Sequence, residues 1–266
     1  MYAWQWEPSV LIGLALLAGG YLAGVGPLRG RLAGSAPAPR WRSRLFLVGV
    51  LILFVALVSP LDTLADSYLL SMHMVQHLLI TLIVPPLLLA GTPSWLLRPL
   101  LRPRYALPIG RALTNPVFAF LVFNMTFAAW HVPALYELTL ENEAVHILEH
   151  LMFLVTATLT WWPIFGPLDE LPRLPDPGQI VYLFLQSLPP TILGALITFA
   201  GAPLYPAYTT APRVWGLSVM ADQQIGGLIM WIPGALVFFA VLTGVFFRWL
   251  NREEYEQSQD VRRVAR

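Results

Sequence analysis

The segment LLSMHMVQHLLITLIVPPLLLAG, residues 69–91, runs for 23 residues without a charged side chain. A helix needs about 20 mostly apolar residues to cross the hydrocarbon core of a bilayer. A spanning backbone must also satisfy its own hydrogen bonds, and no alternating strand pattern is visible in this stretch. The segment therefore predicts a transmembrane helix, and the same test applied outward along the chain decides the fold class.

Seven segments meet this test, and they extend over most of the chain. The whole composition agrees, because 57% of the residues are hydrophobic and only 12% are charged, against roughly 25% charged residues in soluble domains. We expect an all-α, polytopic membrane protein that forms one domain over residues 1–266, with a polar tail at 252–266. The predicted spans are roughly 8–26, 45–61, 69–91, 113–131, 145–165, 179–201 and 219–249.

The basic residues predict the orientation of these spans. All 16 are arginines, and with seven spans only Arg213 falls on the side opposite to the others. Cytoplasmic loops of membrane proteins are enriched in basic residues, so we expect the N-terminus outside and the C-terminus and polar tail in the cytoplasm. The arginines expected inside are Arg29, Arg31, Arg40, Arg42, Arg44, Arg98, Arg102, Arg104, Arg111, Arg173, Arg248, Arg252, Arg262, Arg263 and Arg266.

Five histidines gather at the predicted outer ends of three spans. His73 and His77 form one HxxxH pair, His146 and His150 form another, and His131 ends the fourth span. Residues four apart on a helix share a face, and ionisable groups inside membranes are costly and usually functional. Imidazole is a ligand for copper, zinc, iron and nickel, so the five histidines are candidate metal ligands. The chain has no cysteine, which excludes thiolate sites.

Four other side chains are candidates for supporting roles. Asp62 and Asp66 lie in an acidic outer connection, Met74 offers a thioether that suits Cu(I), and Asp222 opens the last span. An acid at the start of a helix can be a simple cap, or it can hold an imidazole in one tautomer. We favour the second role for Asp222.

Further patterns concern helix shape. The pairs Pro85–Pro86 and Pro189–Pro190 remove backbone donors and should bend their helices. Gly226 and Gly227 should permit close contact between helices. Tryptophans are expected mostly as interface anchors: Trp95, Trp130, Trp161 and Trp162.

Several runs, in chain order, resemble the CtaG-like family of caa-type cytochrome c oxidase assembly factors. The similarity extends from about residue 45 to 250. It implies a non-enzymatic, multi-pass protein of the bacterial plasma membrane that matures a haem–copper oxidase by supplying copper. The runs are Ser59–Pro60–Leu61–Asp62 with Ala65–Asp66, His73–Met74–Val75–Gln76–His77, Pro85–Pro86–Leu87–Leu88, Trp130–His131–Val132–Pro133, His146–Ile147–Leu148–Glu149–His150 and Asp222–Gln223–Gln224–Ile225–Gly226–Gly227.

These observations together predict an assembly factor that binds copper, as Cu(I), at an outward-facing histidine cluster. The expected ligands are His73, His77, His146 and His150, with His131 as a fifth or exchangeable ligand. The expected partners are haem–copper cytochrome c oxidase subunits within the bilayer, and not nucleic acid. Three alternatives stay open: a b-type haem protein, a metal transporter, and a scaffold whose histidines only hydrogen-bond one another.

Overall fold

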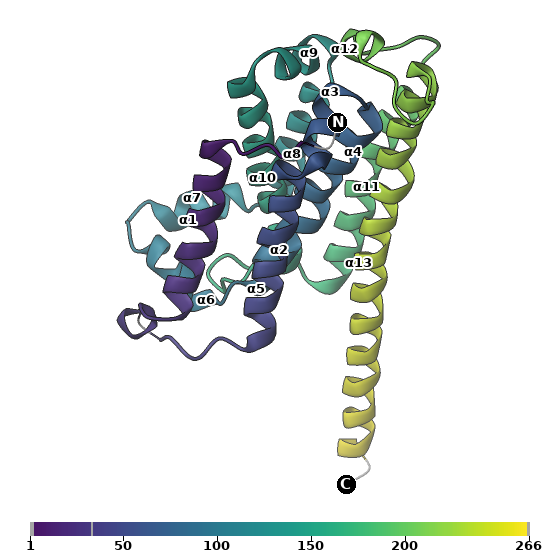
Figure 1. Ribbon diagram of the computed structural model, residues 1–266. Helices are drawn as coiled ribbons and strands as arrows, with labels where there is room; N and C mark the ends of the chain where they lie inside the picture. Colours follow the sequence, from purple (N-terminus) through teal and green to yellow (C-terminus); the bar gives the residue numbers. More distant parts are fainter. Residues whose placement is uncertain (1–2, 33, 265–266) are drawn as a thin grey trace.

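The computed structural model describes residues 3–32 and 34–264. Within that part of the chain every regular element is a helix (Figure 1). Six helical segments are long and apolar enough to cross a membrane, so the structure supports the multi-pass architecture. They are α1 (Pro8–Val25), α2 (Arg40–Val58), the continuous segment Leu70–Gly91, α10 (Glu143–Phe165), α11 (Asp176–Thr198) and α13 (Val219–Val264).

The predicted fourth span, 113–131, differs from a single straight helix. The chain there forms α7 (Ala106–Leu113) and α8 (Pro116–Trp130), which meet at a 64° bend. The break falls where Pro116 follows Asn115, since a proline disfavours helical backbone in the residue before it. The described residues therefore contain six candidate crossings, or seven when this bent pair is taken as one.

Short helices cover the two ends of the bundle. In Figure 1, α3, α9 and α12 lie together at one end and α6 lies at the other. Their bounds are α3 (Pro60–Ser67), α9 (Pro133–Glu141), α12 (Pro206–Thr210), α6 (Ser94–Leu97), and two 3₁₀ segments, η1 (Arg29–Arg31) and η3 (Arg98–Leu101).

Side-chain caps set where helices α3 and α10 begin. Ser59 Oγ accepts the backbone N–H of Leu61 at 3.2 Å and starts α3. Asn142 Oδ1 accepts the backbone N–H of Ala144 at 3.0 Å and starts α10. Such caps satisfy donors that the first turn of a helix leaves free. The second cap places His146 in the opening turns of α10.

The segment Leu70–Gly91 contains a wide turn. It consists of α4 (Leu70–Leu78), the π-helical η2 (Leu79–Ile83) and α5 (Val84–Gly91). Pro85 cannot donate a hydrogen bond to Thr81 four residues earlier, and the indole N–H of Trp161 donates to that carbonyl instead, at 2.9 Å. Trp161 is accordingly only 1% exposed, so its predicted role as an interface anchor is wrong.

Glycines bring α13 into close contact with two neighbours. A Cβ atom at Gly227 would lie 2.7 Å from the carbonyl oxygen of Gly194 in α11, and one at Gly226 would lie 3.3 Å from Leu70 in α4. The predicted close helix contact at Gly226 and Gly227 is therefore confirmed. It fixes α13 against both α11 and the helix that carries His73 and His77.

The predicted polar tail at 252–266 is not a separate segment in the described residues. Helix α13 continues without interruption to Val264, which at 1.5 Å per residue makes it about 69 Å long. Its last part projects well beyond the bundle (Figure 1). Arg252 and Glu256, one turn apart, form an ion pair at 3.9 Å, which is typical of a solvated helix.

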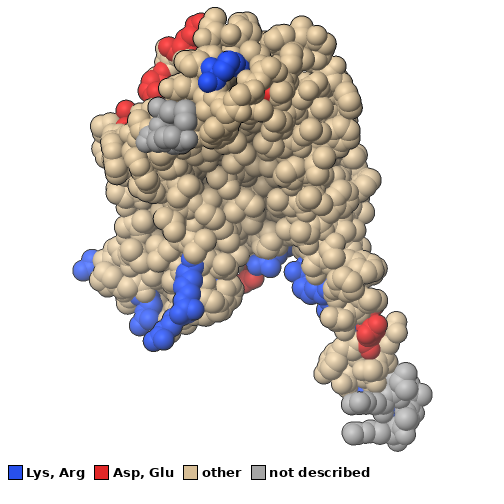
Figure 2. Space-filling view, turned by 45° about the vertical axis from the view of Figure 1, so that its right-hand side comes forward, with Lys and Arg blue, Asp and Glu red and all other residues tan. Residues whose placement is uncertain are grey.

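Charged side chains divide between the two ends of the molecule. Figure 2 shows the basic residues gathered mainly at one end, whereas acidic residues occur at both ends. At the basic end Arg98 pairs with Asp169 at 3.2 Å, and Arg248 pairs with Asp176 at 2.6 Å. The first pair joins the segment after α5 to the loop after α10, and the second joins α13 to the first residue of α11. Arg266 and the side chain of Arg262, both predicted to lie inside, fall outside the described residues.

Candidate metal centre

The five histidine rings converge at the end of the bundle that α3, α9 and α12 cover. Centroid distances are 4.1 Å for His73 and His77 in α4, and 4.2 Å for His146 and His150 in α10. Between helices, His77 lies 5.6 Å from His150 and 5.9 Å from His131, which follows α8. No ring is more than 8% exposed. The predicted convergence is confirmed.

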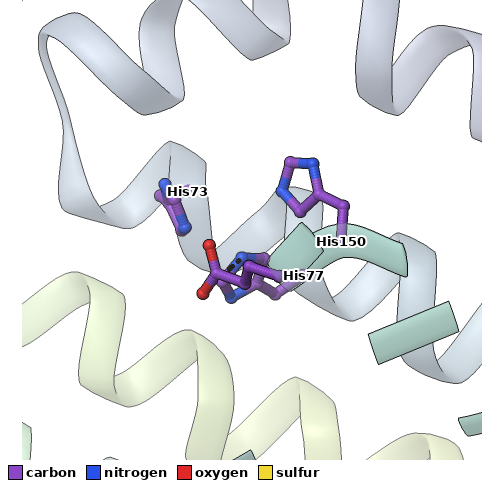
Figure 3. A group of neighbouring side chains, drawn as sticks. His73, His77 and His150 are labelled. Carbon is purple, nitrogen blue, oxygen red and sulfur yellow. Dashed lines mark ion pairs between the residues drawn. The ribbon is translucent and has the colours of Figure 1, made fainter. Parts of the chain in front are cut away.

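The inner group consists of His73, His77, Glu149 and His150. These four side chains offer ligand atoms that all lie within 4.8 Å of one another. Figure 3 shows the three labelled rings turned toward a common centre, where Glu149 Oε1 lies 3.8 Å from His77 Nε2. Metal bonds of roughly 2.0–2.2 Å to nitrogen and oxygen hold ligand atoms up to about 4.4 Å apart. The group is thus close to the size of a coordination shell.

A second group, called the outer group below, lies next to the first on the side of α3. Asp66 in α3 has one carboxylate oxygen 3.8 Å from His73 Nδ1 and the other 3.4 Å from His146 Nδ1. Asp66, His73 and His146 also satisfy the distance test for metal ligands. His73 belongs to both groups, so the two are adjacent and not independent.

Most polar atoms of these groups have no hydrogen-bond partner among the described residues. This holds for both ring nitrogens of His73 and His77, both oxygens of Glu149, and Nε2 of His146 and His150. A buried polar atom without a partner costs about 1–3 kcal/mol, and such atoms are rare in folded proteins. Their concentration here, on imidazoles and a carboxylate, is typical of a site for a cation.

His131 is oriented by its own helix. Its Nδ1 donates to the carbonyl oxygen of Phe127 at 2.7 Å, because a carbonyl can only accept. Nε2 is then the basic nitrogen, and it is buried without a partner among the described residues. His131 lies beside the inner group but is not a member of it, and its predicted role as an exchangeable ligand stays a prediction.

Comparison with known proteins agrees with the resemblance found in the sequence. A family model described as cytochrome c oxidase caa3 assembly factor matches residues 19–252. The chain belongs to this family. The membership rests on almost the whole membrane domain, including every histidine of the cluster.

The curated relatives are mycobacterial and longer than this chain. "Uncharacterized protein Mb0105" of Mycobacterium bovis and "Uncharacterized protein MT0111" of Mycobacterium tuberculosis are each 29% identical over 279 residues. The match covers 97% of this chain but 41% of each relative. "Uncharacterized protein ML1998" of Mycobacterium leprae is 28% identical, with 94% and 40% covered. No solved structure matches the chain.

Glu149 is a member of the inner group that was not predicted from the sequence. It is 0% exposed although it is a carboxylic acid within a membrane helix. Two signals were available. Glu149 stands three residues after His146 and so shares its helix face, and an acid inside an apolar span is a functional candidate by default.

Asp222 has a different role from the one predicted. Its carboxylate accepts the backbone N–H of Leu70 at 2.8 Å, the backbone N–H of Ser71 at 3.1 Å, and the Ser71 hydroxyl at 2.5 Å. It therefore caps the first turn of α4 from a neighbouring helix, and its bonds go to the backbone and a hydroxyl rather than to an imidazole. A negative charge is also favourable at this end of a helix.

Met74 and Asp62 are turned away from the ligand groups. Met74 is fully buried and packs toward Gly226 of α13, so the expected thioether ligand faces the protein core. Asp62 accepts a hydrogen bond from Gln76 Nε2 at 2.7 Å. The pKa of Asp62 is raised to about 7, mainly by burial; the Gln76 hydrogen bond lowers this pKa and the charge of Glu143 raises it. Asp62 supports α4 from outside the centre.

Proposed function

We propose that this assembly factor binds a copper ion in the inner group and supplies it to a haem–copper cytochrome c oxidase. The observation that carries the proposal is the set of buried, unpartnered ligand atoms on His73, His77, Glu149 and His150. The family description, cytochrome c oxidase caa3 assembly factor, supplies the target. The proposed role is non-catalytic, since carrying an ion requires only an exchange of ligands.

The types of ligand atom in the inner group indicate which oxidation state of copper it would bind. Three imidazoles and one carboxylate suit Cu(II), whereas Cu(I) prefers soft sulfur ligands. The chain has no cysteine, and Met74 faces α13. We therefore propose Cu(II) as the bound form, in place of the Cu(I) expected from the sequence. Zinc accepts the same donors and must be compared directly.

The surrounding protein is arranged for reversible binding. The HxxxH spacing on α4 and α10 places ligands on two different helices, whose His77 and His150 rings lie 5.6 Å apart, so a small relative movement of the helices changes the set of atoms around the ion. His131 and His146 lie close to the inner group and provide further donors. An excess of ligands lets an ion leave by replacing one bond at a time, as a delivery protein requires.

The packing of the rings disfavours a haem. A b-type haem requires two axial imidazoles on opposite faces of a broad, flat macrocycle. Here the rings of His73 and His77, and of His146 and His150, lie 4.1 and 4.2 Å apart. Neighbouring histidines therefore fill the plane that the macrocycle would need, which supports a single ion instead.

We also propose the cellular arrangement. Seven crossings with the arginine-rich end in the cytoplasm place the histidine cluster near the outer surface of the bacterial plasma membrane. From there the ion can reach an oxidase subunit laterally within the bilayer. The gathering of most basic residues at one end in Figure 2 supports this orientation.

The test is copper retention by protein purified without a histidine tag. After loading with Cu²⁺ and washing with a chelator, elemental analysis should find copper in the wild type. His77→Ala, His150→Ala and Glu149→Gln should each retain about tenfold less or lower, with oxidase maturation reduced in parallel. Electron paramagnetic resonance distinguishes Cu(II), which gives a signal, from Cu(I), which does not.

The matched control is Met74→Leu, which changes the same helix at nearly constant volume on the side that packs toward Gly226 of α13. It should retain copper like the wild type. A wild type that retains no copper contradicts the proposal. Loss of oxidase maturation with unchanged copper retention supports a scaffold, metal flux in sealed vesicles supports a transporter, and a Soret band supports haem.

A further inference from the structure

A polar cavity opens beside the histidine cluster. Its volume is about 290 Å³, and it lies between the segment before α1, helix α3 and the start of α10. None of its lining residues is an arginine. Its ionisable lining residues are Glu7, Asp62, Asp66, Glu143, His146 and His150.

The charge of this cavity suits cations. Four carboxylates around a small, partly enclosed space create a negative potential that concentrates positive ions from the adjoining water. An anion would be repelled by the same four carboxylates. Carboxylate and imidazole together favour a divalent transition-metal cation.

Asp66 connects the cavity to the cluster. Its side chain is 26% exposed toward the cavity, while its two oxygens lie 3.4 Å from His146 Nδ1 and 3.8 Å from His73 Nδ1. An acidic cavity alone would not define a site. The second observation is that His146 Nε2 and both nitrogens of His73 are buried beside it without hydrogen-bond partners in the described part of the chain.

His73 is the side chain common to both ligand groups. It is 0% exposed, and its ring lies 5.8 Å from that of His146 in the outer group and 4.1 Å from that of His77 in the inner group. An ion held by the outer group therefore lies next to the inner group. It can move there without returning to water.

We propose that Asp66, His73 and His146 form a loading station for the inner group. A divalent cation enters through the acidic cavity, binds at this station, and then exchanges Asp66 and His146 for His77, Glu149 and His150 around His73. The exchange leaves the charge and oxidation state of the ion unchanged. This inference rests on the proposed function, because it requires the inner group to hold a metal ion.

The loading station predicts that capture rate and retention depend on different residues. Cu²⁺ uptake by the full-length protein can be followed by stopped flow, with a chromogenic chelator reporting free copper. Asp66→Asn combined with His146→Gln should slow loading about tenfold while the copper retained after a chelator wash stays at the wild-type amount. His77→Gln combined with His150→Gln should still capture copper rapidly but lose it in the wash.

The matched control is Glu141→Gln, an exposed carboxylate near the start of α10 that does not line the cavity; its loading rate should be unchanged. Far-UV circular dichroism and gel filtration establish that each variant is folded, and the isosteric single variant Asp66→Asn provides a milder test of the same rate.

Loading at the wild-type rate in both Asp66 variants would overturn the loading station and leave the proposed function intact. Loss of retention as complete as in the inner double variant would show one undivided site and also overturn it. A wild type that retains no copper defeats the proposed function itself.

Discussion

Asp222 ties the last helix of the bundle to the helix that carries His73 and His77. The carboxylate is 1% exposed and accepts three hydrogen bonds from Leu70 and Ser71. Asp222→Ala leaves two backbone donors and a hydroxyl unpaired in apolar surroundings, so we expect unfolding in detergent to become easier by about 2–4 kcal/mol. Asp222→Asn, which keeps one acceptor oxygen, should lose less.

The measurement is thermal or denaturant unfolding in one detergent, with Asp169→Ala as a control for an exposed aspartate. Copper retention by Asp222→Ala should also fall, because the first turn of α4 positions His73. Stability equal to the wild type in Asp222→Ala would contradict the capping role.

The sequence predicted the histidine cluster but not the atoms that complete it. An HxxxH pair is a local pattern, so its shared face follows from helix geometry alone. The bonds of Asp222 join residues 151 and 152 positions apart, and nothing local indicates that its partners are backbone groups of another helix. The orientation of Met74 likewise depends on which neighbour packs against α4.

Close contact between α11 and α13 is a property of two glycines on facing helices. Gly227→Ala places a methyl group 2.7 Å from the carbonyl oxygen of Gly194, which forces the helices apart. We expect a loss of about 1–3 kcal/mol in unfolding free energy. Gly244→Ala on the same helix meets nothing within 4 Å and should be neutral or stabilising by up to about 1 kcal/mol. Equal effects of the two substitutions would refute a specific role for this contact.

Helix positions were more predictable than helix interruptions. The apolar runs located six spans within a few residues, because hydropathy alone decides which segments can cross a bilayer. The bend between α7 and α8 was missed, and the polar tail was expected as a frayed helix end, whereas α13 continues as a regular helix to Val264. The hydrogen bond from the Trp161 indole to the Thr81 carbonyl could not be predicted either. A carbonyl that a proline leaves without its helical donor finds another partner only in the folded bundle.

The orientation expected from the arginines can be tested with single cysteines, because the native chain has none. Ser35→Cys, in the connection between α1 and α2, should resist a membrane-impermeant thiol reagent in intact cells and react after lysis. Glu141→Cys, at the histidine end, should react in intact cells. The reverse pattern would invert the topology and place the cluster next to the cytoplasm.

The π-helical turn at Leu79–Ile83 has a consequence for how the span Leu70–Gly91 can vary. A wide turn takes up one residue more than an α-helical turn, so it shifts the helical phase of the residues after it by about 100°. Before the turn, α4 brings the ring of His77 to 5.6 Å from that of His150 in α10; after the turn, α5 packs against both α2 and α10. The helical phase of α5 is therefore set apart from that of α4. The imidazole face can be aligned with its ligand partners while the apolar face keeps its own register against the bundle.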